Sequence, residues 1–561
     1  MKFLAALTTI LGSSLCVHGA KSKGRPNIVF IFTDDQDLLH GSTVFTNHYA
    51  TVAVCCPSRV SLMCGQAAHN TNNTNIKAPA GGYPKFVLSG EGEDYLPHWL
   101  KKAGYNAECT RAPLACSNIG KLFNGSSLLN YSPGPQGWRH IDVLVASHQP
   151  RAGTFINSHN TVVMSENGGR PKHYRGFHQS DVVRIRTLSR LDKLLAEDDP
   201  FFLMIALTAP HVENRYDAPT AAARHLDTFA NLIVPQRPDK NPADKFQKQK
   251  PAWLRGLEPL NSTQIDAIDI LYQRRVEALQ SVDYIITDVV KKLEAKGELD
   301  KTYIIYSTDQ GVDSIDFAPT FLEIAGLAKK DQPSFLDGES LLKAWKNPHC
   351  HALAKKKEVI NVEFWGNGWT QLKTWSGGDY ASYFPGLYLE NDDKTMRYVG
   401  EKASWMYSRW CTNDTVLYNT KDDPYELTNP ADAMDPHIQR VKSGLNALLL
   451  VTKSYAEASC RDPWGVIQPP RQRQGKKVKT LDDAMDPAFD DFYSSFPLVN
   501  IEKCLTYQLA KNEGPFYPPK AEFGLGLKHR KSTGNLVSLD ADPVKKLEKN
   551  NPLGGGLNHR H

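Results

Sequence analysis

Long apolar runs are missing from this sequence. The longest apolar stretch covers residues 3–16, and none of the later ones reaches the ~18 residues that a membrane-spanning helix needs, so we predict no membrane span. A charge excess is missing too, because 66 basic residues face 61 acidic ones, giving a dispersed net charge of +5. This composition argues against binding to nucleic acid. We find no internal repeats either.

The two ends of the chain differ in composition from its middle. Residues 1–20 have the pattern of a secretory signal peptide, with Lys2, the apolar stretch and the small residues Gly19 and Ala20. Residues 520–561 are rich in Gly, Lys and Asn and have too few apolar side chains to bury, so we expect a largely disordered tail. The length between the ends exceeds the ~250–300 residues at which single cores stop growing, which predicts more than one domain.

Two apolar segments end in acidic residues. The segment 27–33 is rich in β-branched and aromatic residues and is followed directly by Asp34 and Asp35. A similar segment at 302–307 comes shortly before Asp309. Continuous apolarity is typical of parallel strands buried on both faces, and sites in open α/β sheets lie beyond the carboxyl ends of such strands. Adjacent carboxylates at a strand end favour a hard divalent cation with oxygen ligands.

A third feature is the segment 55–65, Cys-Cys-Pro-Ser-Arg-Val-Ser-Leu-Met-Cys-Gly. Pro57 is suited to the first position of a helix, where its missing N–H costs nothing and its φ is already set. Cys55 would then lie just ahead of a helix N-terminus, whose N–H groups and positive dipole end favour an anion. Arg59 would follow in the first turn. As a purely structural pattern, the segment would be a buried cysteine pair beside a proline-started helix.

The segment 55–65 matches C-x-P-S-R-x-x-L-x-x-G, and together with the upstream Asp-Asp pair it resembles the type I sulfatase family. The likeness covers roughly residues 26–430 and is nearest to secreted fungal arylsulfatases and N-acetylglucosamine-6-sulfatase-like enzymes. It implies an α/β, alkaline-phosphatase-like fold with a doubly wound mixed sheet. It also implies a calcium-dependent hydrolase of a small-molecule or carbohydrate sulfate ester. A formylglycine-generating enzyme would oxidise its cysteine to formylglycine (3-oxoalanine) during secretion.

The resemblance also assigns roles to residues. Cys55, and not Cys56, is the residue to be oxidised, since only Cys55 has Pro and Arg at the family's spacing. Arg59 would hold the hydrated aldehyde. Two further residues, Lys121 after Gly120 and His211 in the Ala-Pro-His segment, would bind the substrate sulfate. The implied catalytic set is Cys55, Arg59, Lys121 and His211. The implied calcium ligands are Asp34, Asp35, Cys55, Asp309 and Gln310, the last of which stands where the family has Asn or His.

The order of predicted elements favours two domains. We expect the catalytic domain over residues 23–354, with strands and helices alternating in the doubly wound manner, and a smaller α+β domain over residues 359–510. Amphipathic helices are predicted at 94–104, 181–196 and 262–296. The last of these has Ser262 or Thr263 as its N-cap and Gly297 as its stop. The Pro-, Lys- and Asp-rich segment 234–250 is predicted to be a surface loop.

Secretion leads to further expectations. Disulfides form in that pathway. Cys411 with Cys460 is the first candidate pair, and Cys109 and Cys116 are close enough to close a small loop, although sequence alone leaves the connectivity open. We expect an extracellular protein, with the lysosome or vacuole as the alternative location. N-x-S/T triplets predict glycosylation at Asn72, Asn130, Asn261 and Asn413, and a fifth triplet at Asn124, beside Lys121, is expected to be unused.

Three segments depart from the family pattern. Only nineteen residues separate Asp35 from Cys55, where the family has a helix and a strand. Residues 108–119 look like an insertion in place of a short strand. Only three residues separate Gly311 from the segment 315–320, where the family has several dozen residues that include a second site lysine. Two alternatives to an active sulfatase therefore stay open: a secreted, metal-binding homologue with impaired catalysis, and a phosphodiesterase or phosphonate hydrolase of the same superfamily.

Overall fold

In the computed structural model of the protein, the described residues are 24–36, 49–105, 116–146, 156–213, 217–309, 314–347, 358–366, 368–369, 387–388, 392–400, 402–470 and 477–515. The predicted signal peptide and tail lie outside the described residues. So do Cys109, the predicted metal ligand Gln310, Gly311 and most of the segment between Asp35 and Cys55.

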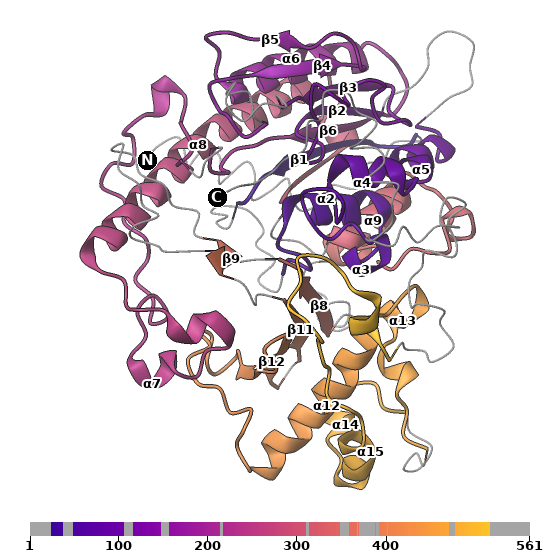
Figure 1. Ribbon diagram of the computed structural model, residues 1–561. Coiled ribbons are helices and arrows are strands. Elements are labelled where there is room, and N and C mark those ends of the chain that lie inside the picture. Colours follow the sequence, from indigo (N-terminus) through magenta and orange to yellow (C-terminus); the bar gives the residue numbers. More distant parts are fainter. Residues whose placement is uncertain are drawn as a thin grey trace.

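A seven-stranded mixed sheet with the order β5-β4-β3-β2-β6-β1-β7 forms the centre of the N-terminal part (Figure 1). Its strands are β1 (Asn27–Thr33), β2 (Cys116–Gly120), β3 (His140–Leu144), β4 (Val163–Glu166), β5 (Lys172–His173), β6 (Phe202–Ala206) and β7 (Thr302–Thr308). Strands β3, β2, β6, β1 and β7 run parallel, whereas β4 and β5 are antiparallel to their neighbours. In the middle of the sheet, Ile31 of β1 aligns with Ile205 of β6 and Tyr306 of β7.

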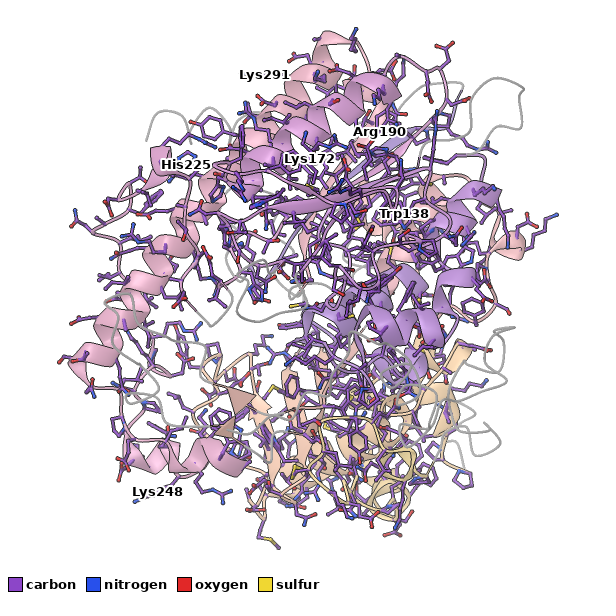
Figure 2. The ribbon with its side chains drawn as sticks, turned by 45° about the horizontal axis from the view of Figure 1, so that its top comes forward. Trp138, Lys172, Arg190, His225, Lys248 and Lys291 are labelled. Carbon is purple, nitrogen blue, oxygen red and sulfur yellow. A yellow bond between two sulfur atoms is a disulfide. The ribbon has the colours of Figure 1, made fainter. Side chains whose placement is uncertain are left out.

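The side chains of β1 alternate between two cores, as the pleat of a strand requires. Phe30 and Phe32 lie in one core and Val29 and Ile31 in the other. On the first face lie α2 (Cys55–Cys64), α4 (Gly82–Leu88), α5 (Leu96–Lys102) and α9 (Phe317–Ile324), with Trp138 packed against their core (Figure 2). On the second face lie α6 (Gln179–Leu194) and α8 (Ser262–Ala295). The result is a three-layer α/β/α arrangement, in agreement with the predicted fold class.

The predicted helices are present with shifted ends. The segments expected at 94–104 and 181–196 form α5 and α6. The cap predicted for α8 is wrong by one or two residues. Asn261 is the N-cap: its side chain accepts from the N–H of Gln264, whose side-chain oxygen accepts from the N–H of Asn261. This capping box satisfies two helix-end donors, which a lone hydroxyl cap does not. Gly297 follows the helix with a φ of 68°, as expected for its stop.

A separate antiparallel sheet occupies the C-terminal region (Figure 1). Its order is β13-β12-β11-β8, and its strands are β8 (Val359–Phe364), β11 (Asp393–Val399), β12 (Ser404–Trp410) and β13 (Thr415–Asn419). The long helix α12 (Pro436–Thr452) shares an apolar core with this sheet. Besides short 3-10 helices, the other α-helices and strands of the described residues are α3 (Ala68–Thr71), α7 (Asp244–Gln247), α10 (Leu342–Lys346), α13 (Ala458–Arg461), α14 (Leu481–Ala484), α15 (Asp490–Ser494), β9 (Gly368–Trp369) and β10 (Leu387–Tyr388).

The segment 234–250 is more structured than predicted. It contains α7, and its end is bound to the C-terminal region, where the Lys250 ammonium donates to the carbonyl of Glu426 and the Gln249 side chain accepts from the N–H of Asn429 at 2.8 Å. The inserted segment expected at 108–119 also needs correction. Residues Cys116–Gly120 form β2, so a short strand does lead into Lys121.

A disulfide joins Cys411 to Cys504, and the predicted pairing of Cys411 with Cys460 is wrong. Residues 501–515 return to the C-terminal sheet, where Asp392 binds the backbone beside both ends of the disulfide. Its carbonyl accepts from the N–H of Cys411 at 3.0 Å, and its carboxylate accepts from the N–H of Leu505 at 2.6 Å. Cys116 is a buried free thiol.

The predicted glycosylation sites differ in accessibility. Asn261 and Asn413 are exposed. The amide nitrogen of Asn130 donates to the carbonyl of Gly125 at 2.9 Å, and the side-chain oxygen of Asn72 is buried. No helix in the described part of the chain is both long and apolar enough to cross a membrane.

Candidate active site

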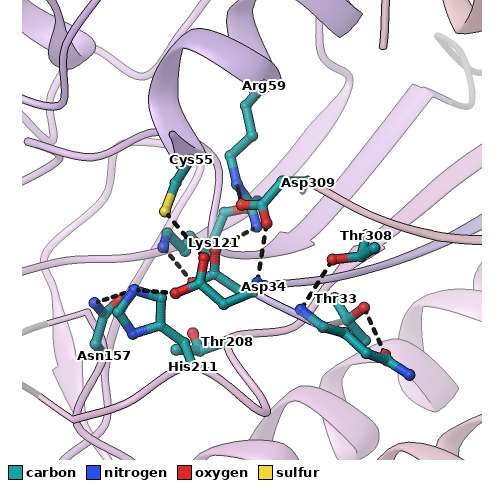
Figure 3. A network of polar contacts seen from close by, with 12 residues as sticks. Thr33, Asp34, Cys55, Arg59, Lys121, Asn157, Thr208, His211, Thr308 and Asp309 are labelled. Atoms are coloured by element: carbon teal, nitrogen blue, oxygen red, sulfur yellow. Dashed lines mark hydrogen bonds and ion pairs between the residues drawn. The ribbon is translucent and has the colours of Figure 1, made fainter. Parts of the chain in front are cut away.

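The candidate site lies at the carboxyl ends of four adjacent parallel strands. Asp34 and Asp35 follow β1, Asp309 follows β7, Lys121 follows β2, and His211 comes shortly after β6. These strands are neighbours in the order β2-β6-β1-β7. Residues far apart in the sequence therefore meet at one edge, where ligands bind in open α/β sheets. Figure 3 shows the side chains of Asp34, Lys121, His211 and Asp309 close together near Cys55, at the start of α2.

Cys55 is the first residue of α2. Its N-cap is Val54, in an extended conformation, so the helix begins two residues earlier than the position of Pro57 led us to expect. Cys55 is 6% exposed, and its Sγ lies 3.8 Å from Oδ1 of Asp35. Burial raises the pKa of the Cys55 thiol well above its ordinary value, and the charge of Asp34 raises it further. An unmodified Cys55 is thus a protonated thiol and a weak nucleophile, because the thiolate is the reactive form.

Arg59, one turn further along α2, binds the carboxylates of Asp309 and Asp34. Its Nε donates to Oδ2 of Asp309 at 2.8 Å, and its Nη2 donates to Oδ1 of Asp34 at 3.3 Å. The guanidinium is 1% exposed and lies 4.9 Å from the centre of the Phe32 ring. Burial opposes the charged form, but Asp309 and Asp34 raise the pKa of Arg59 above its ordinary value. The Arg59 guanidinium therefore binds Asp34 and Asp309, in addition to the role expected for it at position 55.

Lys121 is fully buried, and its ammonium contacts Oδ2 of Asp34 directly. Burial disfavours both charges, yet the field of Lys121 lowers the pKa of Asp34 below its ordinary value, and Asp34 in turn raises the pKa of Lys121. Asp309 behaves differently. Burial and the charge of Asp34 raise its pKa, and the charge of Arg59 offsets only part of this effect. Arg59 and Lys121 therefore do not fully compensate the negative charge of the clustered aspartates.

The imidazole of His211 lies close to Cys55 and Asp34, with ligand atoms of the three residues within 4.8 Å of one another. Its Nε2 lies 3.1 Å from Oδ2 of Asp35, and its Nδ1 donates to the carbonyl of Val212. Two residues that the sequence analysis missed hold it in place. The side-chain amide of Asn157 lies 3.4 Å from Nε2 of His211, and Nε2 of His159 donates to the His211 carbonyl at 3.0 Å. Burial lowers the pKa of His159 to about 4, so this imidazole is neutral.

The three aspartates fit a hard divalent cation. One carboxylate oxygen from each of Asp34, Asp35 and Asp309 lies within 4.8 Å of the others. Calcium takes oxygen ligands of this kind. Asp34, Cys55 and His211 form a second such group, but a thiol sulfur is a soft ligand and does not suit calcium. Cys55 would fit this site only with an oxygen in place of its sulfur.

Sequence reasoning named most of the site but left out Asn157, His159 and Arg275. The guanidinium of Arg275, on α8, donates to the backbone carbonyl of Asp35. Asn157 and His159 lie in a segment without a strand or helix pattern, and Arg275 is one of two adjacent arginines in a long amphipathic helix. No local signal in the sequence separates these residues from ordinary surface positions.

Comparison with known proteins agrees with this geometry. A family model described as Sulfatase matches residues 17–332, more than half of the chain, and the chain therefore belongs to the sulfatase family. Among curated relatives, an arylsulfatase of Volvox carteri is 29% identical over 89% of this chain and 86% of its own length. The human N-acetylglucosamine-6-sulfatase is 27% identical over 83% of this chain and 91% of its own length. Membership of this family makes the protein a sulfuric ester hydrolase.

A solved structure supports the fold. The Bacteroides fragilis protein yidJ, described as a sulfatase, superimposes with a TM-score of 0.51 at 15% identity, over 74% of this chain and 94% of its own. At this identity, the likeness concerns the alkaline-phosphatase-like fold alone.

Proposed function

We propose that this chain hydrolyses the sulfate ester of an aryl compound or a carbohydrate, with formylglycine made from Cys55 and with one calcium ion. The observation that supports this most directly is the position of Cys55. It begins a helix that points its N-terminus at three clustered carboxylates and at His211. A buried thiol has little use there, whereas an oxygen nucleophile beside a cation and a helix N-terminus suits an anionic substrate.

Two groups absent from the polypeptide itself would supply part of the chemistry. Formylglycine at position 55, in its hydrated form, would supply one hydroxyl as the nucleophile for sulfur and a second hydroxyl whose collapse to the aldehyde would release sulfate. A calcium ion held by Asp34, Asp35 and Asp309 supplies positive charge for the sulfate oxygens. The cysteine would be oxidised by a formylglycine-generating enzyme during secretion, which is consistent with the observed disulfide.

The chain's own residues then have separable tasks. Lys121 and Arg59 offset part of the charge of Asp34 and Asp309, and a bound cation would offset the rest. His211 lies close to Cys55 and Asp35, where its Nε2 can bind a sulfate oxygen or hold a proton near the leaving group. Asn157 and His159 orient the imidazole for that task.

The test combines mass spectrometry with an activity assay. In the secreted protein, the tryptic peptide containing Cys55 is expected to have the mass of an aldehyde rather than a thiol. Cys55→Ser should abolish turnover of 4-nitrocatechol sulfate. The matched control is Cys56→Ser, because the Cys56 thiol lies on the other side of the helix start, 3.8 Å from Oδ1 of Asn73, and should be largely dispensable. An unmodified Cys55 in an active enzyme would refute the proposal.

A further inference from the structure

Asp35 has a backbone conformation that is unusual for a residue with a side chain. Its φ is 57°, in the left-handed region, which only a few per cent of non-glycine residues adopt, although Asp does so more often than most. Such conformations persist when the surrounding structure fixes them, and they cluster at functional sites. The peptide groups on both sides of Asp35 therefore need partners that hold them in this orientation.

Three residues, Asp309, Thr308 and Arg275, supply these partners. The peptide before Asp35 is held by its N–H, which donates to Oδ1 of Asp309 at 3.0 Å. The peptide after it is held at both ends. Its N–H, from Gln36, donates to Oγ1 of Thr308 at 3.1 Å, and its carbonyl accepts from the guanidinium of Arg275. Thr308 is the last residue of β7 and Asp309 follows it, whereas Arg275 belongs to α8, on the second face of the sheet.

Arg275 is placed on a rigid support. It belongs to α8, whose inward face lies in the second core through Ala278, Val282, Ile285 and Val289. The position of its guanidinium is thus set by a long packed helix and not by the loop that it contacts. A planar fork of donors on such a support can fix the orientation of a single carbonyl group.

We propose that Arg275 is a positioning residue for the metal site. By holding the carbonyl of Asp35, it keeps this residue in the left-handed conformation in which its carboxylate lies beside Asp34 and Asp309 and faces Cys55 and His211. Without Arg275, the peptide after Asp35 keeps only the hydrogen bond from the N–H of Gln36 to Thr308. Its carbonyl can then turn toward a conformation with negative φ at Asp35, which would move the carboxylate away from the other two. This inference rests on the proposed calcium site.

The experiment measures calcium binding directly. Wild-type protein, Arg275→Met and Arg275→Lys are freed of metal with a chelator and titrated with calcium by calorimetry, and their metal-free melting curves are recorded. The matched control is Lys291→Met, which removes one positive charge from the exposed side of the same helix (Figure 2). Turnover of 4-nitrocatechol sulfate is then followed at increasing calcium concentration.

Arg275→Met is expected to weaken calcium binding about 10- to 100-fold, as losses of groups that orient metal ligands do. Arg275→Lys, which keeps the charge but has a single donor group, should weaken calcium binding less. Lys291→Met should leave calcium binding unchanged. Added calcium should restore part of the turnover of Arg275→Met. Unchanged calcium affinity in Arg275→Met, or a lower metal-free melting temperature with unchanged affinity, would overturn the inference. If Arg275→Met does not fold, wild-type affinity in Arg275→Lys overturns it. A wild-type protein that binds no calcium would instead refute the proposed metal site, and this inference with it.

Discussion

The Nε of Arg59 lies 2.8 Å from Oδ2 of Asp309, although 250 positions separate the two residues. The same guanidinium donates to Asp34 and, at 2.9 Å, to the carbonyl of Lys121. One side chain on α2 thus contacts residues at the ends of β7, β1 and β2. The motif that surrounds Cys55 therefore does more than present a nucleophile, because it also assembles the carboxylates opposite it.

Arg59→Met is expected to lower the free energy of unfolding by about 3–5 kcal/mol, since it leaves two buried carboxylates without their shared cation. Urea unfolding followed by tryptophan fluorescence measures this change. Arg237→Met is the control. Its partner Asp239 lies on the surface, and the Arg237 side chain is 61% exposed, so less than ~1 kcal/mol should be lost. Equal losses in both variants would show that the buried pairs contribute no more than a surface pair.

Calcium is expected to stabilise the folded protein. A ligand at 100 times its Kd adds about 2.7 kcal/mol to the free energy of unfolding, so chelation should lower the melting temperature. Asp309→Asn removes one of three carboxylate ligands and should abolish most of this calcium dependence. Asp244→Asn, at an exposed position on α7, should retain it. A melting temperature of the wild type that is indifferent to chelator and calcium would contradict the site.

The sequence allowed β1 and β7 to be predicted well, because a buried parallel strand has a local pattern, whereas β2, in the middle of the sheet, was mistaken for part of an insertion. The bounds of β1 were predicted residue by residue, and the positions of Asp34, Asp35 and Asp309 at strand ends followed from the same pattern. The contacts between distant residues were not predictable in this way. The pairing of Cys411 with Cys504 depends on the return of residues 501–515 to the C-terminal sheet, and the contact of Arg275 with Asp35 depends on how α8 crosses the other layer.

A buried ion pair between the two parts of the protein should make stability depend on pH. Nδ1 of His69 lies 2.8 Å from Oε1 of Glu363, and Lys394 binds the same carboxylate at 2.9 Å. Burial opposes both charges. Glu363 nevertheless raises the pKa of His69, and His69 and Lys394 lower the pKa of Glu363 to about 2.

The sign of each shift defines a pH window. The His69 contribution is fully present below its unfolded pKa of about 6.5 and is lost as the pH rises through its raised value. The Glu363 contribution is present above about 4.5 and is lost as the pH falls through about 2. The pair therefore stabilises the fold most between about pH 4.5 and 6.5. In His69→Gln, the decline in unfolding free energy from pH 6 to pH 9 should become shallower. An unchanged slope, measured by urea unfolding at each pH, would contradict this prediction.

The short connection after Asp309 is expected to limit catalysis. In the described residues, β7 is the outermost strand of the sheet and pairs only with β1, and its side chains are less buried than those of β1. Residues 310–313 lie outside the described part of the chain. The sulfatase pattern has several dozen residues here, including a lysine that would add positive charge at the sulfate.

Inserting the corresponding segment of the Volvox carteri relative between Gly311 and Ser314 should therefore raise the turnover of 4-nitrocatechol sulfate. One charged hydrogen bond that strengthens in the transition state is worth about 10²–10³ in rate, so a gain of this order is expected from the lysine. The control insertion has the same length and sequence, with that lysine replaced by Met. It separates the charge from the effect of extending the sheet. Equal turnover by the original chain and the lysine-containing version would show that the short connection is harmless, and that Lys121 and His211 suffice to bind the sulfate.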